Sequence, residues 1–91
     1  MLYVWMGFLK DVGGQVPQDV QQLTTEFLRQ PYINIRSVGP LLDEAGRRAA
    51  MMMVFEVDSR ATAEALIENS PYMKAGLYKE HRLFEFHDEV G

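Results

Sequence analysis

The chain contains no cysteine, so disulfides, thiolate zinc sites and a cysteine nucleophile are all excluded. Imidazole is scarce as well, because the only histidines are His81 and His87. Six residues along one strand at about 3.3 Å per residue separate them by roughly 20 Å, so one zinc ion cannot bridge both. We therefore expect neither a metal nor a cofactor.

Basic runs are also lacking, and the formal net charge is -4, so the footprint of a nucleic-acid-binding protein is missing. The apolar start, Met1 to Leu9, has no basic leader or small-residue cleavage site, and it is too short to span a membrane. We therefore expect a cytoplasmic protein with neither a nucleic-acid nor a membrane partner.

Ninety-one residues with 47% hydrophobic side chains are typical of one globular domain, here taken as residues 1–91. Proline and glycine delimit the segments between apolar patterns. The expected elements are strands at 2–9, 32–38, 47–57 and 78–87, helices at 17–30 and 60–68, a hairpin-like connection at 39–46 and a helical turn at 70–76. The order βαββαβ predicts an α+β, ferredoxin-like fold, in which helices cover one face of a four-stranded antiparallel sheet.

Two of the expected strands are apolar on both faces. In the first, Leu2, Val4, Met6 and Phe8 alternate with Tyr3, Trp5 and Leu9; in the third, Met51, Met53 and Phe55 alternate with Met52 and Val54. In a ferredoxin-like sheet these two strands are central. Two helices cover only one face, so the sequence predicts a homodimer formed through the other. The alternative is that the connections at 10–17 and 39–46 fold over that face.

Several side chains are candidates for chemistry. His81 is the better candidate for a general acid or base than His87, which lies near the terminus. The alternative, which we favour, is that His81 is a strand-edge histidine that pairs with Glu80 or Glu85 and faces water. Arg36 is a candidate for holding a carboxylate, against the alternative of a surface ion pair. Trp5, with the methionine run 51–53, is a candidate for lining an apolar pocket, although packing in the core or dimer explains these residues as well.

From Gly39 onward the chain resembles the YCII-related family of dimeric α+β barrel proteins. The matching segments are Gly39-Pro40-Leu41, Asp43, Gly46, Ser59, Ala63-Glu64-Ala65-Leu66, Ser70-Pro71-Tyr72-Met73-Lys74-Ala75-Gly76-Leu77 and Phe84-Glu85-Phe86. The resemblance implies a ferredoxin-like fold, a single YCII-like domain, dimers formed sheet to sheet, and a cleft beside the sheet. It also implies cofactor-free acid/base chemistry on small organic molecules, of the dehydrochlorinase, isomerase or lyase type.

The chain departs from this family pattern at the expected acid/base pair. The family commonly has a histidine in or near the first helix, paired with the aspartate of an Asp-Pro turn. Here the segment 17–30 has no histidine, and Ser70 stands at the aspartate position. Ser70 and Tyr72 are then candidates for lining the cleft, with Ser70 and His81 as candidate catalytic groups. Ser70 is equally a candidate for a helix cap and no more.

Three functions stay open from the sequence. The first is a small dimeric protein that binds, and in one version transforms, an organic molecule in the cleft. The second is a non-catalytic binding or interaction module that has lost the histidine and aspartate pair. The third is an oxygenase on the same fold, cofactor-free or haem-dependent, of which the haem version is disfavoured by the absence of a helix histidine.

Overall fold

The computed structural model describes residues 1–31 and 33–90 of the chain. Its elements, in chain order, are β1 (Leu2–Leu9), α1 (Gln18–Leu28), β2 (Asn34–Leu42), β3 (Arg48–Glu56), α2 (Arg60–Glu68), α3 (Pro71–Lys74) and β4 (Tyr78–Phe86). The predicted βαββαβ order is confirmed, with α3 as the helical turn expected before the last strand. The expected start of the second strand at residue 32 lies outside the described residues.

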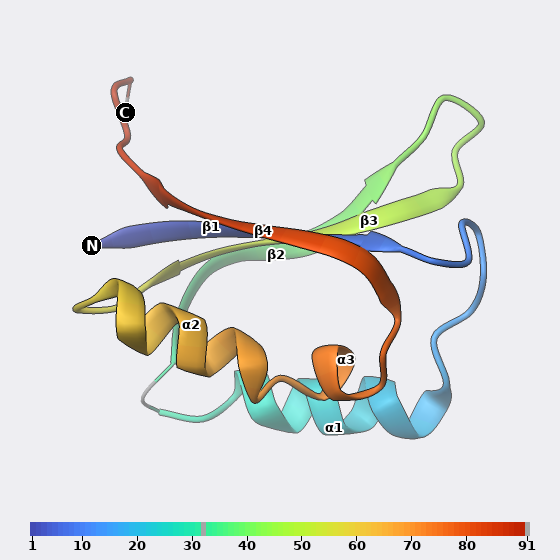
Figure 1. Cartoon of the computed structure of the whole chain (residues 1–91), viewed down its shortest axis with the longest axis horizontal. Helices are drawn as coiled ribbons and strands as arrows, with labels where there is room; N and C mark the ends of the chain where they lie inside the picture. The colour runs from blue at the N-terminus through green and yellow to red at the C-terminus, as the bar shows by residue number, and fades with distance from the viewer. Residues whose placement is uncertain (32, 91) are drawn as a thin grey trace.

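The strands form one antiparallel sheet in the order β2-β3-β1-β4, so β1 and β3 are central as predicted. All three helices lie on the same side of this sheet (Figure 1). The α+β, ferredoxin-like prediction is therefore confirmed for the chain, and the two sheet faces have different surroundings.

The face toward the helices holds the core. Tyr3 and Trp5 from β1 and Phe55 from β3 are almost completely buried, and the rings of Tyr3 and Phe55 stack with their centroids 6.2 Å apart. Helix α2 contributes Ala63, Leu66 and Ile67, which recur at helical spacing and are all buried. One face of each central strand is thus covered within the chain.

The opposite face is apolar and has no helix on it in the described part of the chain (Figure 1). Leu2, Val4, Met6 and Phe8 of β1 lie on this face, and the register places Val4 between Val54 of β3 and Phe84 of β4. The aromatic side chains of β4 are the most open part, with Phe84 52% and Phe86 42% exposed. The connection 10–17 runs to α1 on the other side of the sheet, so it does not cover this face.

The second strand extends further than the sequence predicted. We expected Gly39 and Pro40 to end it, but β2 continues through both residues to Leu42. Proline is tolerated here because β2 is an edge strand, where a missing N–H need not break a ladder between two neighbours. The turn instead centres on Asp43, whose carboxylate accepts hydrogen bonds from the backbone N–H groups of Ala45 (3.0 Å) and Arg47 (2.9 Å).

Both helices in the C-terminal half begin at a serine cap. The hydroxyl of Ser59 accepts from the backbone N–H of Thr62, and the hydroxyl of Ser70 accepts from that of Met73. Gly76 closes the turn after α3 with φ +69°, a conformation that glycine adopts without a Cβ clash. The two serine caps and Gly76 thus determine where α2 and α3 begin and where α3 ends.

Gly7 is expected to be intolerant of any side chain, because aromatic rings lie directly over it. An added Cβ would sit 2.6 Å from Trp5 Cη2 and 2.8 Å from Tyr78 Cδ1. Gly7→Ala should lower the free energy of unfolding by about 1–3 kcal/mol, as overpacking does in other cores. Urea unfolding followed by circular dichroism measures the change. Gly39→Ala is the matched control, because its Cβ would meet nothing within 4 Å; equal effects of the two substitutions would contradict this account.

Candidate functional site

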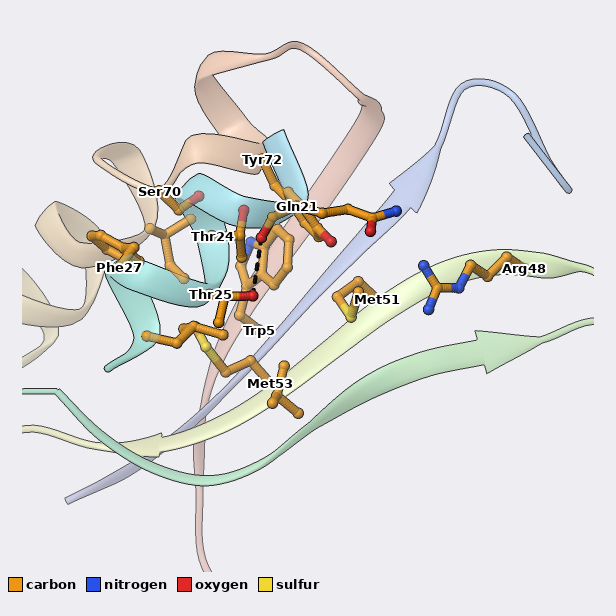
Figure 2. A pocket seen from close by; sticks show the side chains of 13 residues that line it. Trp5, Gln21, Thr24, Thr25, Phe27, Arg48, Met51, Met53, Ser70 and Tyr72 are labelled. Atoms are coloured by element: carbon orange, nitrogen blue, oxygen red, sulfur yellow. Dashed lines mark hydrogen bonds between the residues drawn. The ribbon is translucent and has the colours of Figure 1, made fainter. Parts of the chain in front are cut away.

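A cavity of about 260 Å³ lies between the sheet and the helices α1 and α3 (Figure 2). Every layer of the fold contributes to its wall. The lining residues are Trp5 from β1, Gln21, Thr24, Thr25, Phe27 and Leu28 from α1, Val38 from β2, Arg48, Met51 and Met53 from β3, Ile67 from α2, and Ser70 and Tyr72 from the α3 turn. The cavity thus brings together Trp5, Ser70 and Tyr72, which are three of the candidate site residues from the sequence.

Aromatic and thioether side chains give the cavity an apolar body. The indole of Trp5 packs edge-on against the ring of Tyr78 with the centroids 5.1 Å apart, and Tyr72 lies 6.3 Å from the same tyrosine. Met51 and Met53 of the methionine run point to this side, whereas Met52 lies on the open sheet face. Flexible thioethers beside rigid rings suit a compact apolar molecule.

Arg48 is the charged residue of this lining. Four other arginines are paired with carboxylates, through Arg36–Glu56, Arg47–Asp43, Arg60–Glu64 and Arg82–Glu80. Within residues 1–31 and 33–90, Arg48 forms no such ion pair. Sequence reasoning missed this residue because it stands beside Arg47 in an unremarkable Arg-Arg pair, and only the strand register turns one of the two into the cavity.

Two hydroxyl groups near the cavity are buried without a hydrogen-bond partner in the described structure: Thr24 Oγ1 and the phenol of Tyr78. Thr24 belongs to the lining, and Tyr78 packs directly behind Trp5. A buried hydroxyl that lacks a partner costs about 1–3 kcal/mol. These two groups are therefore unsatisfied in the ligand-free protein.

The environment of Tyr78 raises the pKa of its phenol above the ordinary value of 10.0. Burial is the main cause, the neighbouring Tyr72 adds to it, and the positive charge of Arg48 acts in the opposite direction. Tyr78 therefore stays protonated, as a hydrogen-bond donor, throughout the neutral pH range. Its phenol is also near enough to both Arg48 and Tyr72 to interact with them electrostatically.

Ser70 and Tyr72 occupy the turn that resembles the Asp-Pro turn of the YCII-related family. Ser70 Oγ accepts from the backbone N–H of Met73 at 3.3 Å, so this hydroxyl caps α3 and still has its own proton to donate. Tyr72 is half-buried in the wall of the cavity. Ser70 is therefore both the cap of α3 and a hydroxyl of the cavity lining.

His81 lies behind the cavity rather than in its wall. Its Nδ1 accepts a hydrogen bond from the indole Nε1–H of Trp5 at 3.2 Å, which leaves Nε2 on the exposed side. The imidazole borders a second groove, whose other lining residues are Arg60, Glu64, Ile67, Glu68, Arg82 and Leu83. His81 therefore pairs with neither Glu80 nor Glu85, and it reaches the cavity only through Trp5.

Arg36 is not brought to the cavity. Its guanidinium forms an exposed ion pair with Glu56, the alternative raised from the sequence, and this arginine holds the pKa of the Glu56 carboxyl below its usual value. His87 pairs with Glu85 near the C-terminal end of β4. Neither residue joins Trp5, Ser70 and Tyr72.

Neither a metal-binding cluster nor a membrane-spanning helix is found among residues 1–31 and 33–90. No three histidine or acidic side chains lie close enough together to hold a metal ion. None of the helices there has the length and apolar character needed to cross a bilayer.

The fold and site together define a small α+β protein with a ferredoxin-like sheet and a cavity under its helices. The model of the YCII-related domain matches residues 1–87, so the chain belongs to the YCII-related family, as the resemblance from Gly39 onward indicated. No curated protein matches the chain.

Among solved structures, the 5-chloro-2-hydroxyhydroquinone dehydrochlorinase TftG of Burkholderia phenoliruptrix, in complex with 2,5-dihydroxybenzoquinone, is similar with a TM-score of 0.71 and 18% identity, over 96% of this chain and 94% of that one. At this identity the similarity establishes the fold.

Two further structures match with TM-scores below 0.5, so they carry no weight for function. One is a putative antibiotic biosynthesis monooxygenase from Chloroflexus aurantiacus, with a TM-score of 0.45 and 15% identity over 100% of this chain and 98% of that one. The other is an uncharacterized NIPSNAP domain protein from Burkholderia xenovorans, with a TM-score of 0.42 and 10% identity over 100% and 99%.

The raised pKa of Tyr78 predicts an alkaline loss of stability. In the unfolded chain the phenol ionises near pH 10, whereas in the folded protein it stays neutral, so unfolding releases a proton above that pH. The contribution of the neutral Tyr78 phenol to the free energy of unfolding is complete below pH 10 and falls as the pH rises further. Urea midpoints at a series of pH values from about 8 to 11 should decline more steeply for the natural protein than for Tyr78→Phe. Parallel curves for the two proteins would contradict the assignment.

Proposed function

We propose that this chain acts as a single YCII-like domain, forms a cytoplasmic homodimer, and binds a small organic molecule about the size of one ring in the cavity under the helices. The observation that carries the proposal is the cavity itself, with an apolar body and a few polar groups at its wall. This combination is characteristic of small-molecule sites. The cytoplasmic location stays a prediction from the sequence.

The size of the cavity limits the ligand. Its volume of about 260 Å³ is slightly below the roughly 300–1,000 Å³ typical of drug-sized ligand pockets. The indole of Trp5 and the ring of Tyr72 offer flat apolar surfaces for stacking. These properties favour a single planar ring over a chain or a nucleotide.

The homodimer is supported by the open sheet face. Val4, Phe84 and Phe86 lie on a face that no helix of the described chain covers, and monomers rarely leave such large side chains exposed together. A second copy has the same surface to offer, so an isologous contact buries both faces at once.

Cofactor-free proton transfer, as in isomerisation or elimination, is the second candidate function. It is favoured by the imidazole of His81, which accepts a hydrogen bond from Trp5, a residue of the cavity wall. TftG, whose fold is similar, is a dehydrochlorinase, and loss of hydrogen chloride is an elimination. Non-catalytic binding is the better supported version, because the lining contributes no carboxylate and no imidazole that could accept a proton.

Ligand binding is tested by thermal shift and calorimetry with single-ring molecules, starting with 2,5-dihydroxybenzoquinone, the ligand of the TftG complex. A molecule bound only by the folded state should raise the melting temperature with concentration. Val38→Trp should remove the shift, because Val38 lines the cavity and is 45% exposed, so an indole can extend from it over the opening. Leu42→Trp, on the same strand but outside the lining, is the control. Binding that survives Val38→Trp unchanged would exclude this cavity.

The dimer is tested by light scattering after size exclusion. The natural protein should elute with twice the monomer mass and bury well over ~1,000 Å². Phe84→Glu should give folded monomers, because a charged side chain on the open face cannot be buried without a partner. Leu23→Glu alters an equally exposed apolar residue on α1 and should leave the dimer intact. A natural protein that is monomeric at micromolar concentration would exclude the dimer.

Substitutions at His81 separate the two candidate functions. If the imidazole transfers a proton, His81→Gln should reduce turnover by about 10²–10⁴, the usual contribution of a general acid or base. If the protein only binds, the same substitution should change ligand affinity by no more than about 1–2 kcal/mol, because a glutamine carbonyl can still accept from Trp5 Nε1. His81→Leu removes that acceptor and serves as the comparison. Full turnover in His81→Gln would exclude His81 from catalysis.

A further inference from the structure

The polar groups around the cavity are one guanidinium, one side-chain amide and several hydroxyls. Arg48 supplies guanidinium N–H groups, and Ser70 keeps its hydroxyl proton because its oxygen is used to cap α3. Thr24 Oγ1 is buried there without a partner. Thr25 already donates to the Gln21 carbonyl at 3.0 Å, which Figure 2 marks with a dashed line. Arg48 can only donate and Ser70 still has a proton to donate, so a ligand beside these two groups must bring acceptors, whereas Thr25 Oγ1 and Gln21 Oε1 can still accept.

The charge of the cavity has one sign. The protein as a whole carries a net charge of -4, yet Arg48 is the charged residue among the lining side chains, and no carboxylate of the described residues neutralises it. A guanidinium that is partly buried and unpaired favours an anionic group beside it, because charge-assisted hydrogen bonds are the strongest that side chains make.

The geometry divides the cavity into a charged end and an apolar body. In Figure 2, Arg48 lies at one end of the lining, beyond Met51, while Phe27 and Ser70 lie at the other end and Trp5 lies between them. The unsatisfied phenol of Tyr78, 9% exposed as a residue, is close enough to Arg48 to feel its charge. A ring packed against Trp5 and Met51 would thus direct a substituent toward the guanidinium.

We propose that the natural ligand of this cavity is a small single-ring organic anion, whose carboxylate or ionised hydroxyl is bound by Arg48 while its ring packs against Trp5 and Met51. The inference rests on the proposed function, since it names the ligand class of the same cavity. Arg48 is the specificity-determining residue, and it selects by charge rather than by shape.

Three nearly isosteric probes isolate the charge: benzoate is an anion, benzamide is neutral and benzamidine is a cation. Titrations are followed by NMR through the indole N–H signal of Trp5, which is the single tryptophan of the chain. Benzoate should bind at least about tenfold more tightly than benzamide, the difference expected for a hydrogen bond to a charged group. Benzamidine should bind most weakly of the three.

Arg48→Gln should weaken benzoate binding about tenfold or more and leave benzamide binding within about twofold, which removes the preference for the anion. Arg47→Gln is the matched control, because the neighbouring arginine pairs with Asp43 and does not line the cavity. It should leave all three affinities unchanged.

The outcomes separate the inference from the proposed function. Equal affinities for the three probes, or a preference for benzamidine, would overturn the anion assignment and leave the cavity as a small-molecule site. A benzoate preference that persists in Arg48→Gln would overturn the role of Arg48. If neither these probes nor 2,5-dihydroxybenzoquinone bind, both the proposed function and the inference are excluded.

Discussion

The indole of Trp5 lies over Gly7 at the centre of the sheet, and the rest of the site is arranged around that contact. Its ring packs against Tyr78 and lines the cavity, and its Nε1 donates to His81 on the neighbouring strand. The ring can occupy this position only because residue 7 has no side chain. Core packing, the cavity and the nearest imidazole are therefore linked through one residue.

The central strands β1 and β3 create a second constraint, because they are apolar on both faces. Helices and the cavity occupy one face, where the cavity is a partly open space between the sheet and the helices α1 and α3. The other face has no cover within the described chain, and it exposes Phe84 and Phe86. The proposed dimer and the proposed ligand site thus lie on opposite faces of the same sheet. Substitutions such as Phe84→Glu and Arg48→Gln can separate the two properties.

The chemistry of the site differs from what the family resemblance implied. A charged aspartate and a helix histidine would have supplied an acid/base pair, but Ser70 caps a helix and α1 has no histidine. The cavity contains instead a guanidinium, several hydroxyls and aromatic rings. These groups can recognise and orient a ligand, and none of them is a carboxylate or an imidazole, the usual general acid and base groups. The arrangement is better suited to selecting an anion than to transforming it.

Local patterns in the sequence were sufficient for much of the fold. Apolar runs delimited by glycine, proline and polar residues identified β1 and β3, and the order of the elements gave the architecture. The end of β2 was predicted wrongly at Gly39 and Pro40, since whether proline interrupts a strand depends on whether that strand is at an edge. That information exists only once the sheet is assembled.

The candidate site was likewise predicted only in part from the sequence. The sequence by itself determined the family and showed that the central strands are apolar on both faces. It also identified Trp5, Ser70 and Tyr72 as candidate site residues. Each of these results depends on residue type and on near neighbours in the chain. Only the tertiary structure decided that Arg36 pairs with Glu56 while Arg48 faces the cavity, and that His81 stands behind Trp5. Partners of this kind are far apart in the chain, and strand register and helix packing, rather than local pattern, bring them together.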